Sequence, residues 1–241
     1  IGDVERAIGE NVASLVRDGD TLQLGIGAIP DAVLLFLKEK NDLGIHTEQI
    51  GASMAHMIQN GVVTNRYKNL DKGWSVGAFI IADNFTYNYV NNHPRIMMRR
   101  GRYTNDPMII AQQDNMVSIN AALQIDLTGQ VAAEAIGTVQ WSGTGGATDY
   151  AYGAYHSRGG RAMLCQISTA KKGTVSRIAP ILDPGSIVSV SRNLTDMVIT
   201  EYGVAKLRQR TVKQRVENLI AVAHPDFRAE LRKEANKYMY F

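Results

Sequence analysis

Apolar and polar positions alternate along the chain with the periods of helices and strands. Within residues 3–18 the apolar side chains fall on one face of a helix, with Asp3 available as its N-cap. The apolar segment 21–24 predicts a buried strand, and residues 30–38, with a proline in the first turn, predict the next helix. The chain therefore opens with a helix, a strand, a glycine-containing turn and a second helix.

The alternation of strands and helices continues to the end of the chain, with one exception. Residues 122–140 predict an antiparallel hairpin that turns at Gly129. The whole pattern is typical of an α/β protein with an open, mostly parallel sheet flanked by helices and an antiparallel hairpin section. Further strands are expected at 43–48, 74–82, 116–120, 162–167, 176–181, 187–190 and 197–200, and further helices at 84–91, 106–113, 147–156, 204–207, 212–223 and 225–238.

Composition and charge narrow the class of protein. The 241 residues, 45% of them hydrophobic, suffice for a real core, and no repeat or linker divides them, so residues 1–241 are expected to form one domain. The 26 basic and 23 acidic residues are too evenly balanced to indicate nucleic-acid binding. A single cysteine, Cys165, is expected in the core and is typical of a reducing compartment. No apolar run reaches the roughly 18 residues that span a bilayer, so the sequence predicts a cytoplasmic protein without a membrane partner.

Glu48 is the first candidate for chemistry, because it ends the apolar segment that starts at Leu43. Strand ends in open α/β sheets are where ligands bind and reactive side chains are presented. A surface carboxylate or a helix cap is the alternative interpretation of such a glutamate. Two residues earlier, His46 points to the same side of the strand, where it would either orient the carboxylate or pack in the core.

Two glycine-rich turns offer backbone N–H groups to an anion or an oxyanion. The first, Gly25-Ile26-Gly27, leads into a helix but lacks the third glycine of a dinucleotide fingerprint and the lysine of a P-loop, and a plain tight turn is the alternative. The second spans residues 142–146. Two such turns and one strand-end carboxylate favour activation of an acyl group over hydride or phosphoryl transfer. The five histidines show no paired ligand spacing, so no metal site is predicted.

Seven motifs follow one another along the chain: Gly25-Ile-Gly-Ala-Ile-Pro30, Leu43-Gly-Ile-His-Thr-Glu48, Asn105-Asp-Pro107, Ser118-Ile-Asn120, Asp126-Leu-Thr-Gly-Gln130, Ser142-Gly-Thr-Gly-Gly146 and Thr200-Glu-Tyr-Gly-Val-Ala205. Together they resemble the acetyl-CoA hydrolase/transferase family, and in particular its 4-hydroxybutyrate and butyryl-CoA:acetate CoA-transferases. The resemblance covers the C-terminal half of the usual family protein and implies a CoA-transferase-type domain.

The resemblance also implies roles for individual residues. In that family the glutamate that ends the motif is the nucleophile, which implies this role for Glu48, and Asn105 resembles an amide donor to an acyl or carboxylate oxygen. Coenzyme A or acyl-CoA enters as a substrate, and no tightly bound cofactor is implied. The implied coenzyme A site comprises Gly25, Ile26, Gly27, Ala28 and Ile29, with Asn120, Gly143, Gly145 and Gly146.

The activity implied by the resemblance is that of a CoA-transferase. It would move CoA between a short-chain acyl-CoA and a free carboxylate such as acetate, butyrate or 4-hydroxybutyrate, by a ping-pong route through a glutamyl-CoA thioester on Glu48. Two alternatives stay open: an acyl-CoA hydrolase that uses the same glutamate, and a noncatalytic half that binds CoA or supports a partner. The chain enters a helix directly after Ile1, so we expect the N-terminal half of the enzyme as a separate or cleaved chain, and an oligomer.

Several other polar residues are weaker candidates. Glu134 is the rival carboxylate but is expected within the hairpin, and Glu201 is expected to form structural hydrogen bonds near the site. A set of basic residues is a candidate either for contact with CoA phosphates or for a solvated face. These residues are Arg99, Arg100, Arg102, Lys171 and Lys172.

Overall fold

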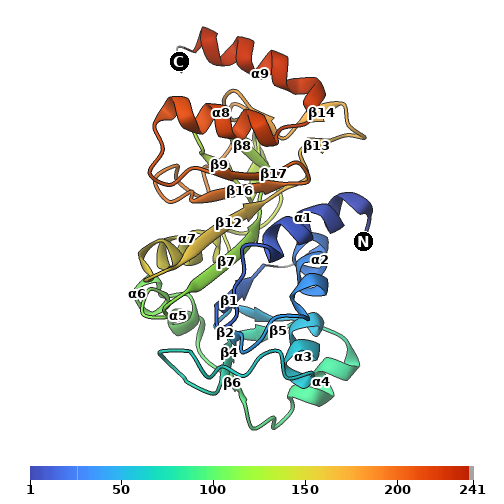
Figure 1. Cartoon of the computed structure of the whole chain (residues 1–241), viewed down its shortest axis with the longest axis vertical. Helices are drawn as coiled ribbons and strands as arrows, with labels where there is room; N and C mark the ends of the chain where they lie inside the picture. The colour runs from blue at the N-terminus through green and yellow to red at the C-terminus, as the bar shows by residue number, and fades with distance from the viewer. Residues whose placement is uncertain (26, 239–241) are drawn as a thin grey trace.

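The computed structural model describes residues 1–25 and 27–238, and an open sheet forms its centre (Figure 1). The strands of this sheet are β1 (Thr21–Leu24), β2 (Gly44–Ile45), β7 (Met116–Ala121), β12 (Arg161–Cys165), β16 (Met197–Thr200) and β17 (Gly203–Lys206). They lie in the order β17-β16-β12-β7-β1-β2; β17 is antiparallel to β16, and the other neighbours are parallel. The predicted α/β class with a mostly parallel sheet is confirmed.

Helices cover both faces of this sheet (Figure 1). Because side chains alternate along a strand, neighbouring residues of β12 belong to different cores: Met163 and Cys165 pack on one face and Leu164 on the other. The buried position of Cys165 agrees with its expected place in the core. The covering helices are α1 (Asp3–Ala13) and α2 (Ala28–Leu37) on the first face, and α7 (Ala147–His156) and α8 (Val212–Val222) on the second.

Beyond the edge strand β2, the chain forms a region of small elements that includes the Glu48 segment. Two short parallel pairs extend the strand arrangement here, and each strand is only two or three residues long. The elements are β3 (Gln49–Ile50) with β5 (Phe79–Ile80), β4 (Ser75–Gly77) with β6 (Ile96–Met98), and the helices α3 (Ala52–Gln59), α4 (Asn84–Val90), α5 (Gly101–Thr104) and α6 (Pro107–Ile110).

The opposite end of the molecule carries the predicted hairpin. β8 (Gln124–Asp126) and β9 (Val131–Ala132) are antiparallel, and Gly129 lies between them with φ of +96°, a conformation that favours glycine. The helix α9 (Pro225–Lys237) packs on α8. Within residues 1–25 and 27–238, no helix is both long and apolar enough to cross a bilayer. The remaining short strands are β10 (Ala135–Ile136), β11 (Val139–Gln140), β13 (Thr169–Ala170), β14 (Val175–Ser176) and β15 (Ile178–Ala179).

Some sequence predictions are wrong in this structure. Residues 204–207 do not form a helix: Gly203, with φ of +129°, allows a tight turn, and the chain returns as β17 alongside β16. Residues 187–190 contribute only an isolated bridge at Val190 instead of a strand. Helix α3 was not predicted. The N-cap of α1 is Gly2, not Asp3, because the Glu5 side chain accepts a hydrogen bond from the Gly2 backbone N–H and closes the helix start there.

Candidate active site

Glu48 lies between β2 and β3, where backbone hydrogen bonds hold the chain on the side of β4 and β5. The N–H of Thr47 donates to the Val76 carbonyl (3.0 Å), and the Glu48 carbonyl accepts from the N–H groups of Ala78 (2.7 Å) and Phe79 (3.1 Å). These bonds leave the Glu48 side chain at the end of the strand segment without involving its carboxylate. The strand end therefore presents a half-buried carboxylate on a fixed backbone.

The carboxylate of Glu48 meets the start of helix α7 at Gly146. A Cβ placed on Gly146 would lie 2.7 Å from Oε2 of Glu48 and 2.6 Å from Nδ2 of Asn105. Both groups thus occupy the space that any side chain at this position would need. Gly146 is the N-cap of α7, and this helix end carries partial positive charge that favours a carboxylate or a developing oxyanion.

The side-chain amide of Asn105 is oriented by its own neighbours. The Thr104 hydroxyl donates to Oδ1 of Asn105 (2.8 Å), and the Asn105 N–H donates to the Gly101 carbonyl (2.8 Å). With Oδ1 engaged as an acceptor, Nδ2 is the amide atom that faces Gly146 and Glu48. Asn105 can therefore donate to an oxygen atom that forms beside the Glu48 carboxylate.

A cavity of about 440 Å³ joins Glu48 to both glycine turns. The structure thus brings together residues that are far apart in the sequence and that the sequence singled out. Phe79 and Ala133 add apolar surface to the wall. The predicted residues that line the cavity with Glu48 are Gly25, Asn120, Gly143, Gly145 and Gly146.

Asn120 forms a reciprocal amide pair with Gln23, a residue that the sequence analysis did not single out. Each amide nitrogen donates to the other residue's oxygen at 2.9 Å, on the neighbouring strands β7 and β1. Gly25 lies against this pair, since its Cβ would be 3.2 Å from Oδ1 of Asn120. The pairing leaves Asn120 one amide N–H and one oxygen lone pair for a ligand in the cavity.

Three further described residues of the predicted coenzyme A site, Gly27, Ala28 and Ile29, do not line this cavity. Gly27 lines a neighbouring space of about 200 Å³, which shares Leu24 and Gly25 with it. Ala28 and Ile29 begin α2 and line neither of these two spaces in the described part of the chain. Ile26 lies outside the described residues.

On its other side, Glu48 borders a second, polar cavity of about 430 Å³. Arg102, Asn105 and Asp149 line it. Burial raises the pKa of the Asp149 carboxyl, and the negative charges of Glu48 and Asp106 raise it further. Glu48 therefore faces a glycine-lined cavity on one side and a charged one on the other.

His46 is fully buried, and its ring bonds to a backbone carbonyl instead of to the Glu48 carboxylate. Nε2 bonds to the Thr104 carbonyl at 3.0 Å, and among the described residues no hydrogen bond joins the ring to Glu48. Burial, followed by the nearby charge of Lys68, lowers the pKa of His46 to about 4. The ring is therefore neutral at physiological pH.

Lys68 lies in the interior beside His46, and the sequence analysis missed it because a lysine is expected at the surface. Its Nζ donates to the carbonyls of Ile45 (2.9 Å) and Trp74 (2.6 Å). Burial lowers its pKa to about 7. Lys68 thus ties the strand segment before Glu48 to the segment that leads into β4.

The weaker candidates are dispersed. Glu134 is buried, and its backbone carbonyl accepts from the N–H groups of Trp141 and Ser142. Glu201 accepts from the Ser168 N–H (2.9 Å) and hydroxyl (2.6 Å), so its expected hydrogen bonding is confirmed.

The candidate basic residues do not gather at one place. Arg102 lines the polar cavity, whereas Arg99 forms an ion pair with Asp71 at 3.1 Å and Arg100 is exposed. Lys171 and Lys172 form a turn in which both residues have positive φ.

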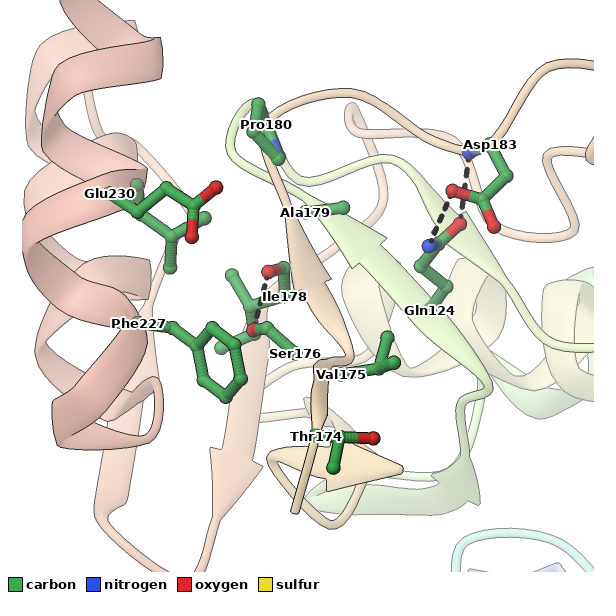
Figure 2. Close-up of a pocket in the computed structure, with 11 residues that line it drawn as sticks. Gln124, Thr174, Val175, Ser176, Ile178, Ala179, Pro180, Asp183, Phe227 and Glu230 are labelled. Atoms are coloured by element: carbon green, nitrogen blue, oxygen red, sulfur yellow. Dashed lines mark hydrogen bonds between the residues drawn. The ribbon is translucent and has the colours of Figure 1, made fainter. Parts of the chain in front are cut away.

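A further cavity of about 340 Å³ lies against α9 (Figure 2). In its wall, the Gln124 amide donates to the Asp183 carboxylate (3.1 Å), and the Asp183 backbone N–H donates to the Gln124 amide oxygen (3.0 Å). Phe227 and Glu230 border it from α9. None of the predicted site residues lines this space in the described chain.

Comparison with known sequences identifies the family. The acetyl-CoA hydrolase/transferase C-terminal domain matches residues 83–235. A 4-hydroxybutyrate coenzyme A transferase of Clostridium kluyveri is 52% identical over 98% of this chain and 55% of its own length. A succinyl-CoA:cyclohexane-1-carboxylate CoA transferase of Geobacter metallireducens is 46% identical over 98% of this chain and 54% of its own length.

Solved structures give the same result. RipA from Yersinia pestis superposes with a TM-score of 0.95 at 45% identity, over 100% of this chain and 54% of RipA. A 4-hydroxybutyrate CoA-transferase from Porphyromonas gingivalis superposes with a TM-score of 0.87 at 45% identity, over 98% of this chain and 56% of that protein. The chain spans about half the length of the relatives it matches. By sequence and by fold, this chain belongs to the acetyl-CoA hydrolase/transferase family.

Proposed function

We propose that residues 1–241 are the C-terminal catalytic domain of a CoA-transferase that uses Glu48 as its nucleophile. The observation that carries the proposal is the convergence of Glu48 Oε2 and Asn105 Nδ2 on Gly146, at the wall of a glycine-lined cavity. The names of the relatives from Clostridium and Geobacter support the same class of reaction. The proposed substrates are a short-chain acyl-CoA and a free carboxylate of the acetate, butyrate or 4-hydroxybutyrate class.

In the first half-reaction, a Glu48 carboxylate oxygen attacks the thioester carbonyl carbon of the acyl-CoA. The carbon–sulfur bond breaks, CoA leaves as a thiolate, and a mixed anhydride joins the acyl group to Glu48. The thiolate then attacks the glutamyl carbonyl carbon. The carbon–oxygen bond of the anhydride breaks, which releases the acyl group as a carboxylate and leaves a glutamyl-CoA thioester.

The second half-reaction is the reverse sequence with a different acid. The incoming carboxylate attacks the glutamyl thioester, CoA thiolate leaves, and a new mixed anhydride forms on Glu48. The thiolate attacks the acyl carbonyl of the new substrate and regenerates the free Glu48 carboxylate. Each step exchanges one activated carbonyl for another, so the energy of the thioester bond is conserved.

The residues around Glu48 supply the stabilisation that these steps need. Each tetrahedral intermediate places negative charge on an oxygen, and a fixed donor aimed at it contributes about 3 to 4 kcal/mol. We assign this role to the Asn105 amide and to backbone N–H groups at the start of α7. The pantetheine arm would lie in the cavity between the two glycine turns, where Asn120 retains an amide N–H.

Hydrolysis is the second candidate, and the polar cavity with Arg102 and Asp149 favours it, because it gives Glu48 a second side that water can reach. Water would attack the same glutamyl thioester in place of the acceptor acid. Release of free thiol that does not depend on added carboxylate would identify a hydrolase. Formation of the CoA thioester of added acetate, butyrate or 4-hydroxybutyrate would identify a transferase.

Substitution of the nucleophile tests the proposal. Glu48→Gln keeps the size of the side chain but replaces the nucleophilic carboxylate with a neutral amide, so transfer should fall on the order of 10³-fold or more. Glu134→Gln, at the buried rival carboxylate, is the control and should retain transfer. A complex with its partner that keeps the unsubstituted rate of CoA transfer when this chain carries Glu48→Gln would instead favour the noncatalytic alternative.

A partner is also part of the proposal. The matched relatives are about twice as long as this chain, so we propose that their other half, on the same or a separate polypeptide, adjoins this site and that the assembly is an oligomer. Native mass spectrometry of the purified protein would measure the composition of the assembly. A monomer of this chain alone with full transfer activity would contradict this part.

A further inference from the structure

The backbone carbonyl of Thr104 accepts hydrogen bonds from two buried side chains. The Tyr150 hydroxyl donates to it at 2.7 Å, and Nε2 of His46 bonds to it at 3.0 Å. Both rings have an exposed fraction of 0%. Water therefore does not compete for this carbonyl, and its position depends on the two rings.

These three residues belong to the three segments that carry the site. His46 precedes Glu48 by two residues, and Tyr150 follows Gly146 by four on the first turns of α7. Thr104 directly precedes Asn105. One carbonyl thus joins the strand end, the amide donor and the helix start, which otherwise come from distant parts of the chain.

We propose that His46 and Tyr150 are positioning residues that hold the Asn105 amide against Glu48 and Gly146 through the Thr104 carbonyl. This inference rests on the proposed function, because Asn105 is assigned there as an oxyanion donor. The Thr104 hydroxyl completes the connection, since it donates to Oδ1 of Asn105 at 2.8 Å. The peptide and the side chain of Thr104 therefore both fix the direction of the amide.

The chemistry of the two rings suits this task. A carbonyl only accepts, so Tyr150 must keep its phenolic proton and His46 must carry its proton on Nε2. Burial, followed by the charge of Glu48, raises the pKa of the Tyr150 phenol, and burial lowers that of His46. Nδ1 of His46 has no hydrogen-bond partner among the described residues. Both rings therefore stay neutral donors across the physiological range.

Tyr150→Phe is the sharpest single test, because it removes only the hydroxyl and keeps the buried ring. In the transfer-competent protein, formation of the glutamyl-CoA thioester at saturating acyl-CoA should slow about five- to tenfold, with KM for acyl-CoA unchanged. Tyr152→Phe, on the same helix but exposed and without a bond to Thr104, is the matched control and should keep the unsubstituted rate. An unchanged rate in Tyr150→Phe would overturn the inference.

A second pair of variants tests His46. His46→Gln offers an amide donor to the same carbonyl and should recover most of the rate that His46→Leu loses. Equal losses in both variants would contradict the positioning role. Thermal unfolding of each variant shows whether the fold is retained, and only rates of folded protein enter the comparison.

A double-mutant cycle separates positioning from a general structural effect. If Tyr150 acts through Asn105, then Tyr150→Phe should slow the Asn105→Ala protein less than twofold, since the amide it positions is absent. The same five- to tenfold loss in both backgrounds would overturn the inference. If no thioester forms on Glu48 in the unsubstituted protein, the proposed function fails; if it forms there at equal rates with and without the Tyr150 hydroxyl, only this inference fails.

Discussion

Gly146 and Gly27, one in each glycine turn, differ in what makes glycine necessary. At Gly146 the backbone is ordinary, but Glu48 and Asn105 occupy the space of a Cβ. At Gly27 no described residue beyond its chain neighbours lies within 4 Å of a Cβ position, but φ is +114°, which a side chain rarely allows. Glycine permits a close approach at Gly146 and an unusual backbone at Gly27.

This difference teaches that a glycine-rich turn does not by itself mark a reacting centre. Both turns precede helices and both offer backbone N–H groups, so the sequence treats them alike. Among the described residues, the second turn alone has both a carboxylate and an amide against its backbone. The turn at Gly146 is therefore the one where we expect substitutions to change chemistry, whereas substitutions at Gly27 should change stability.

The largest expected effect follows from Gly146→Ala. The added methyl group must displace Glu48, Asn105 or both, and displacement of reacting groups by about 1 Å costs on the order of 10²-fold in kcat/KM. Gly51→Ala is the matched control, because its φ is ordinary, no described neighbour lies within 4 Å of its Cβ position, and it lines neither cavity at Glu48. Steady-state transfer assays would measure both variants. A Gly146→Ala protein as active as the Gly51→Ala protein would contradict the close approach of reacting groups at Gly146.

The buried ring of His46 predicts that the free energy of unfolding depends on pH. The pKa of His46 falls from 6.5 to about 4 on folding, so the unfolded chain takes up a proton between these values and the folded chain does not. The free energy of unfolding should therefore fall as the pH drops from 6.5 to 4, by about 3 kcal/mol from this group.

Urea unfolding at pH 7 and pH 4.5 would measure this contribution. His46→Gln should lose less stability between the two pH values than the unsubstituted protein. His156→Gln, at an exposed histidine, should lose as much as the unsubstituted protein. A pH slope that is the same in His46→Gln as in the unsubstituted chain would show that this ring titrates normally.

The smallest effect is expected at the first turn. Gly27→Ala strains the backbone and should lower the free energy of unfolding by about 1 to 2 kcal/mol, while kcat/KM changes less than about threefold. Gly51→Ala, with ordinary φ and open space around its Cβ position, is the control for stability. A loss of kcat/KM in Gly27→Ala as large as in Gly146→Ala would show that both positions matter equally for catalysis.

Much of the fold was predictable because apolar periodicity is strong in its central elements. The predicted bounds of β1, β16 and α7 match the structure. The segment of β17 was misread because four residues are too few to distinguish a helical from an extended period. Helix α3 was missed although Met54, Ala55 and Ile58 form an apolar face, because glycine and polar residues surround it.

The candidate site was predictable only in part. Glu48, Gly25 and Asn120 meet because the carboxyl ends of parallel strands share one edge of a sheet. The Thr104 carbonyl was not predictable, since a backbone oxygen has no signature in the sequence. The partner of His46 was unpredictable for the same reason, and Lys68 contradicts the usual exposure of lysine.

The most direct test of the central claim is to locate the covalent intermediate. The protein is incubated with an acyl-CoA, treated with borohydride or hydroxylamine, digested and mapped by mass spectrometry. We predict modification of the peptide that contains Glu48, at the Glu48 carboxyl, and its disappearance when an acceptor carboxylate is added before trapping. Modification of a different residue, or full transfer with Glu48 unmodified, would contradict the account.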